Sequence, residues 1–131
     1  MKRFLKKYWT SIALCFVILV LCFINPQKIK IDITMTYTDK IVHFAMFLAL
    51  SGIVFWDNSF RLKKKVSVWA LFIGSWLFPI ALSGLIEIAQ DCLTSTRTGD
   101  WLDFLFDSIG ASLGLIVCWI WNRNKLYKTI N

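Results

Sequence analysis

Four apolar runs, separated by polar and basic segments, make up most of the chain. They predict helices at about residues 8–25, 39–57, 66–90 and 101–122. Each run, with its flanks, is long enough to cross a bilayer, which takes about 20 residues. Asn25-Pro26 ends the first run, and Pro79 predicts a kink in the third. The pattern predicts an all-α membrane protein, a four-transmembrane-helix bundle that forms a single domain over residues 1–131.

Composition supports a membrane class. The 131 residues are 57% hydrophobic and 16% aromatic, and the mean hydropathy is +0.61. A soluble domain of this length would be more polar. The net charge of +7 would suggest nucleic acid in a soluble protein. Here the basic residues lie between apolar runs, so membrane topology explains them and no nucleic-acid partner is predicted.

The first apolar run follows a basic segment, as a signal peptide would. It ends in Cys-Phe-Ile-Asn-Pro-Gln, which offers no small-x-small cleavage site, so we expect an uncleaved helix. The four cysteines show no Cys-x-x-Cys pair and no histidine at zinc spacing. They are expected to act as small hydrophobes, although oxidation of Cys92 stays open. The sequence indicates no cofactor.

The charges are distributed unevenly between the two sides of the predicted bundle. Eleven of the 15 Lys and Arg residues lie in the N-terminal segment, the loop at 61–65 and the C-terminal tail. The positive-inside rule therefore predicts that the N- and C-termini are cytoplasmic. Seven of the eight acidic residues lie on the outer side, leaving only Asp57 inside. Because acidic residues contribute little to topology, their clustering marks the outer end as the functional end.

The start of the fourth run carries acids on one helical face. Asp100, Asp103, Asp107, Gly110 and Gly114 follow a three-four spacing, so all five share that face. Carboxylates at this depth usually face a bundle interior or a wet cavity. The two glycines form a small-xxx-small surface on which another helix packs closely, and they predict a homo-oligomer contact.

Polar residues from three predicted helices converge at this outer end. The group comprises Asp39, Lys40, His43, Glu87, Gln90, Arg97, Asp100, Asp103 and Asp107. Each member alone has a structural explanation, such as helix capping by Asp39 or Asp100, an interhelical hydrogen bond from His43, or an ion pair of Glu87. Capping does not explain Asp107, which lies too far into its helix. So many buried polar groups in so apolar a chain predict a ligand or substrate site.

These residues resemble the VanZ-like family of small bacterial membrane proteins. The resemblance covers about 39–114 and rests on four motifs: Asp39-Lys-x-x-His43, Glu87-x-x-Gln90, Arg97-x-x-Asp100-x-x-Asp103 and Gly110-x-x-x-Gly114. It implies a multi-pass protein of the bacterial cytoplasmic (inner) membrane, with its functional face extracytoplasmic and a link to reduced teicoplanin susceptibility. The family usually carries Asn where this chain has Asp107, so Asp107 is not expected to be an essential base.

The predicted function is binding of, or action on, a cell-envelope component, such as a lipid-linked or anionic precursor or a lipid head group. His43, Glu87 and Asp103 are the candidate catalytic residues, with His43 as general acid or base. Asp103 would orient His43 or bind a divalent cation, although nothing in the sequence fixes a metal geometry. Ligand contacts are predicted from the remaining polar residues of the group: Asp39, Lys40, Gln90, Arg97, Asp100 and Asp107.

Two other functions remain as alternatives. A small proton- or ion-coupled carrier would also place Asp, Glu and His in the membrane. It is disfavoured because the acids cluster at one end, without a polar path to the cytoplasmic half. A non-catalytic partner that assembles with other envelope proteins is the third hypothesis.

Overall fold

A computed structural model of the chain describes residues 2–24, 38–59, 67–93 and 99–130, with residues 2–3 and 124–130 described by their backbone alone. Every regular element in these ranges is a helix: α1 (Lys2–Phe23), α2 (Thr38–Ser59), α3 (Val68–Phe72), the π-helical turn η2 (Ile73–Leu77), α4 (Phe78–Leu93) and α5 (Trp101–Ile130). Because α3, η2 and α4 follow without a break, they form a single rod. The described chain thus contains four helices long and apolar enough to cross a membrane, which confirms the predicted fold class.

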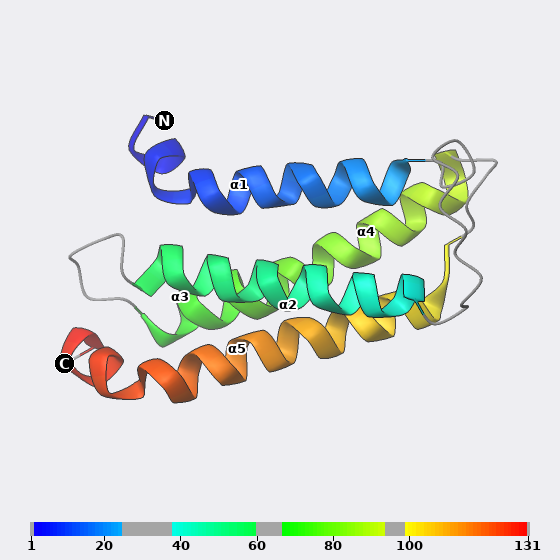
Figure 1. The fold of residues 1–131 in the computed structure, drawn as a ribbon. Coiled ribbons are helices and arrows are strands. Elements are labelled where there is room, and N and C mark those ends of the chain that lie inside the picture. The colour runs from blue at the N-terminus through cyan, green and yellow to red at the C-terminus, as the bar shows by residue number, and fades with distance from the viewer. Residues whose placement is uncertain (1, 25–37, 60–66, 94–98, 131) are drawn as a thin grey trace.

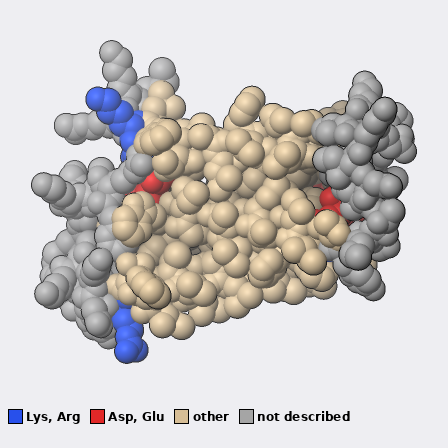
Figure 2. All heavy atoms as spheres, in the orientation of Figure 1, with Lys and Arg blue, Asp and Glu red and all other residues tan. Residues whose placement is uncertain are grey.

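Both ends of the described chain lie at the same end of the bundle (Figure 1). The other end is formed by the start of α2, the end of α4 and the start of α5. In Figure 2 the middle of the visible face is tan, and the blue Lys and Arg atoms appear only at the end that carries the termini. Large apolar side chains are exposed along all four rods, among them Phe16, Leu85 and Val117. An apolar belt with polar ends suits a bilayer.

Two helices are longer than their apolar runs. α1 begins at Lys2, with a kink at Tyr8 where φ is −107° and ψ is 16°. α5 continues to Ile130, although its apolar span ends at Arg123. Lys and Arg are good helix formers, so a helix can extend past the point where its hydropathy falls. The basic loop at 61–65 lies outside the described residues.

The third rod departs from α-helical geometry just before Pro79. The π turn η2 ends two residues before this proline, which is buried. Pro79 has no backbone N–H, so the carbonyl of Ser75 loses its usual i+4 donor. The Ser51 hydroxyl from α2 lies 2.5 Å from that carbonyl oxygen and 2.8 Å from the carbonyl of Ala111. A neighbouring helix thus satisfies the group that the proline leaves free.

α2 is the central helix, and its closest neighbour is α5. A Cβ at Gly114 would lie 2.6 Å from the carbonyl oxygen of Leu48, and one at Gly110 would collide with that of Phe44. The predicted packing surface is therefore confirmed, with α2 as its partner. The backbone of α2 fills the face of these two glycines, so their close contact lies within one chain, and a homo-oligomer stays a prediction.

α1 attaches to the bundle through an apolar face and through polar contacts near both of its ends. At the terminal end, Asp57 of α2 is fully buried and accepts hydrogen bonds from the hydroxyls of Thr10 (2.7 Å) and Ser11 (2.7 Å). At the other end, Gln90 Nε2 of α4 donates to the carbonyl of Cys22 at 2.8 Å. Between them lies an apolar cluster formed by Ile18, Cys22, Phe47, Leu50, Val54 and Ile86. These contacts hold α1 against α2 and α4.

Candidate functional site

The predicted polar residues come together at the end of the bundle opposite the termini. α2 supplies Asp39, Lys40 and His43 from its first two turns. The last turns of α4 supply Glu87, and the first turns of α5 supply Asp103 and Asp107. All but Asp39 are buried, with relative exposures of 8% or less. The three-four spacings read from the sequence thus place these side chains on helix faces that point into the bundle. Arg97 lies outside the described residues.

His43 is held by Asp107. Its Nδ1 lies 3.2 Å from one carboxylate oxygen of Asp107 and 3.3 Å from the other. The Ser83 hydroxyl of α4 donates to the same carboxylate at 2.6 Å. With Nδ1–H as the donor to a carboxylate, Nε2 keeps its lone pair and faces the rest of the site. The orienting contact that was assigned to Asp103 from sequence is made by Asp107, which behaves as a hydrogen-bonding position.

Lys40 forms ion pairs with two carboxylates, one just before α5 and one in its first turn. Its Nζ lies 2.6 Å from Asp100 Oδ2 and 2.9 Å from Asp103 Oδ1. The Lys40 ammonium, followed by the backbone N–H of Leu102, holds the pKa of the Asp100 carboxyl below its usual value of 3.8. The Leu102 N–H lies 2.8 Å from Asp100 Oδ1, so Asp100 also caps α5 as predicted. Lys40 is therefore engaged within the protein rather than open to an anion.

Glu87 uses only one of its two carboxylate oxygens. Oε2 accepts the backbone N–H of Asp100 at 2.7 Å, whereas Oε1 is buried and has no hydrogen-bond partner among the described residues. Gly99 permits this close approach, since a Cβ there would lie 2.6 Å from the backbone oxygen of Glu87. A buried carboxylate oxygen without a donor is costly, so this one points to a missing partner.

A cavity of about 190 Å³ lies beside Glu87, between the end of α4 and the start of α5. Its lining combines acidic and apolar residues and comprises Gly84, Glu87, Ile88, Asp91, Gly99, Asp100, Trp101 and Phe104. Gln90 is not among these residues, and its bond to α1 gives it a structural role.

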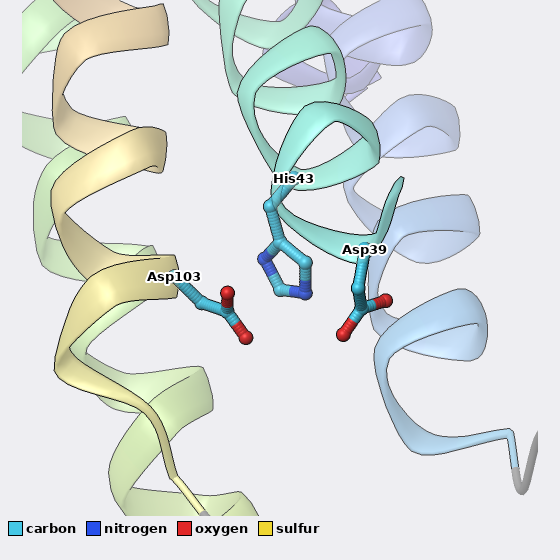
Figure 3. A group of neighbouring side chains, drawn as sticks. All are labelled: Asp39, His43 and Asp103. Carbon is cyan, nitrogen blue, oxygen red and sulfur yellow. The ribbon is translucent and has the colours of Figure 1, made fainter. Parts of the chain in front are cut away.

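Two overlapping groups of side chains have the composition of a metal site. Asp39, His43 and Asp103 form one, and they point toward one another in Figure 3. His43, Glu87 and Asp107 form the other. Within each group the ligand atoms lie within 4.8 Å of one another, and His43 is shared.

Sequence reasoning missed Ser83 as the second partner of Asp107. Its signal was available, because Ser83 precedes Glu87 by four residues and so shares its helical face. Buried polar residues of the opposite half were also missed, including Ser51, Ser75 and Asp57. At ~1.5 Å rise per residue, Ser51 lies about 12 Å from His43 along α2, and Asp57 about 9 Å further. The hydrogen bonds given above for Ser51 and Asp57 join neighbouring helices and do not connect these residues to His43.

Fold and site together define a small multi-pass membrane protein with a buried acidic and histidine-containing site at one end of its bundle. A family model described as VanZ/LLP1 matches residues 2–122, nearly the whole chain. The chain belongs to the VanZ-like family, as the motifs in its sequence predicted. No curated protein and no solved structure matches it significantly.

Proposed function

We propose that the cavity beside Glu87 binds the polar head group of a cell-envelope amphiphile, either a lipid-linked cell-wall precursor or a membrane lipid. The observation that carries this proposal concerns Glu87, which lines the cavity and whose buried Oε1 accepts no hydrogen bond from the described residues. A hydroxyl or ammonium group of a ligand would supply the missing donor. A hydrogen bond from that group to Oε1 would offset the cost of burying this oxygen without a donor, which is about 1–3 kcal/mol or more.

The size and lining of the cavity favour an amphiphile over a soluble metabolite. Pockets that enclose a small molecule are typically ~300–1,000 Å³, and this cavity is smaller, at about 190 Å³. It suits a fragment such as one sugar or one head group, with the remainder of the ligand in the bilayer. Phe104 and the exposed Trp101 line the cavity, and aromatic side chains commonly lie at a membrane interface.

The site is assigned to the extracytoplasmic side of the bacterial cytoplasmic membrane. Both ends of the described chain lie at one end of the bundle, and the sequence predicts that most of the Lys and Arg residues lie on the same side of the membrane. From the positive-inside rule we expect that end to be cytoplasmic and the polar site to face the cell envelope. A link to reduced teicoplanin susceptibility follows from the family and belongs to this proposal.

His43 is the residue that would move a proton if the bound head group reacts. Asp107 holds its Nδ1, as a carboxylate does in acid–base pairs, and leaves Nε2 toward the site. Asp103 and Glu87 flank it as further carboxylates. Binding of the head group requires only the carboxylate oxygens, whereas a reaction also requires His43. Binding and catalysis are therefore tested separately.

Glu87→Gln is the sharpest test of the proposed binding site. The amide oxygen still accepts the Asp100 N–H, while the amide nitrogen replaces Oε1 and turns an acceptor into a donor. We expect the variant to reach the membrane at the normal level, to lose co-purifying envelope lipid in native mass spectrometry, and to lose any protection against teicoplanin.

Ser108→Ala is the matched control, since that hydroxyl bonds only to the carbonyl of Phe104 in its own helix. If Glu87→Gln and Asp103→Asn both retain bound lipid and phenotype at unchanged protein level, the proposed site is wrong.

A further inference from the structure

We propose that Asp39, His43 and Asp103 bind one divalent cation of the first transition series, such as Mn²⁺ or Zn²⁺. Asp107 would stand behind the histidine as its orienting partner. Only the role of the ion rests on the proposed function: the ion would bind an oxygen of the head group. Ion binding itself follows from the geometry of the three side chains.

The three side chains already surround a common point. Asp39 and His43 are one turn apart on α2, and Asp103 faces them from α5 (Figure 3). Their ligand atoms lie within 4.8 Å of one another. Atoms that share an ion at ~2.1 Å lie at most about 4.2 Å apart. Small side-chain rotations are therefore enough to close the set.

His43 is oriented as a metal-binding histidine usually is. Such a histidine commonly donates its other ring N–H to a carboxylate, which fixes its tautomer and raises its basicity. Here Nδ1 faces Asp107 at 3.2 Å, and Ser83 in turn holds that carboxylate at 2.6 Å. The histidine is 98% buried.

Electrostatics favours a cation at this point. A neutral His43 presents a lone pair to the two carboxylates on either side of its ring. The described part of the site also holds Asp100, Glu87 and Asp107 as carboxylates, against Lys40 as its one ammonium. Buried charges without compensation are strongly destabilising in the membrane. Lys40 pairs with Asp100 and Asp103, and a divalent ion would offset the negative charge that this one ammonium leaves.

Glu87 provides independent support for a ligand here. Its oxygen Oε1 is buried without a hydrogen-bond partner, and Glu87 belongs with His43 and Asp107 to the second metal-compatible group. An ion beside His43 would thus lie near an acceptor that the protein leaves unused.

The ligand set selects the kind of ion. Imidazole favours zinc and other transition metals, whereas sites for Mg²⁺ and Ca²⁺ are built from oxygen alone. Three protein ligands leave coordination positions open, as in catalytic metal sites. An anionic head group would bind the ion at these open positions. The ion thus explains how an acidic pocket can bind an anionic head group although Lys40 is already paired with carboxylates.

Metal binding is measured on the full chain in nanodiscs after removal of metal with a chelator. We expect one Mn²⁺ per chain by equilibrium titration, and a nitrogen coupling from imidazole in its pulsed EPR spectrum. His43→Gln and Asp103→Asn should each weaken binding at least tenfold. Asp57→Asn is the charge-matched control at the other end of the bundle, and it should bind as the unaltered protein does.

A wild-type protein that binds neither Mn²⁺ nor Zn²⁺, or whose Mn²⁺ spectrum lacks nitrogen coupling, overturns the proposal without reference to any variant. If Glu87→Gln loses lipid binding and the wild type binds no metal, the proposed function is supported and the metal site is refuted. Metal bound with intact lipid binding in Glu87→Gln would leave the metal site and refute the proposed function.

Discussion

Replacing Gly110 by alanine tests how closely α5 must approach α2. The added Cβ would collide with the carbonyl oxygen of Phe44 and lie 3.2 Å from the backbone nitrogen of Leu48. Both neighbours are backbone atoms, so only a shift of the helices relieves the contact. Overpacking of this kind typically costs about 1–3 kcal/mol, against a gain in helix propensity of at most ~1 kcal/mol. We expect Gly110→Ala to lose about 1–2 kcal/mol of unfolding free energy.

Gly52→Ala is the matched control on the same pair of helices. Its Cβ would meet Cys118 Sγ at 3.5 Å, an ordinary van der Waals contact. We expect this variant to be as stable as the parent or up to ~1 kcal/mol more stable. The two variants are compared by reversible unfolding in mixed micelles. Equal stabilities for Gly110→Ala and Gly52→Ala would refute the backbone contact between α2 and α5.

Three further predictions concern other contacts. Because Lys40 lowers the pKa of Asp100 from 3.8, their contact stabilises the fold above pH ~4 and is lost below it; Asp100→Asn should therefore flatten the acid limb of a stability–pH curve. Ser51→Ala leaves the carbonyl of Ser75 without its side-chain donor and should lower the unfolding free energy by about 1–3 kcal/mol, measured in mixed micelles. Asp57→Ala removes one acceptor that ties α1 to α2, another being Asn58, so we expect faster proteolytic release of α1, while Asp57→Asn should restore most of the attachment.

Much of the fold followed from the sequence because hydropathy and length determine which segments can cross a bilayer. The kink near Pro79 was also predictable, since proline removes a backbone donor wherever it occurs in a helix. Its form as a π turn was not, because that depends on Ser51 of another helix satisfying the freed carbonyl. Local composition does not encode such a neighbour.

The candidate site was predictable in its members but not in its pairings. Helical spacing placed Asp103 and Asp107 on one face, and either could have met His43. The rotation and depth of α5 against α2 decide the pairing, and they bring Asp107 to Nδ1 of His43. The same limit applies to the glycines: a small-xxx-small surface predicts close packing but does not say whether the partner is in the same chain.

The glycine face and the acidic site depend on each other. Gly110 follows Asp107 by one turn and touches the backbone of Phe44, the residue after His43. The contact that brings the two helices together therefore also sets the separation of His43 from Asp107. A larger residue would part them, and the buried carboxylate would lose a donor that water does not replace at this depth. For this reason the small residues continue the same helical face as the acids: the face that packs most closely is the one that can hold charged groups in fixed contact.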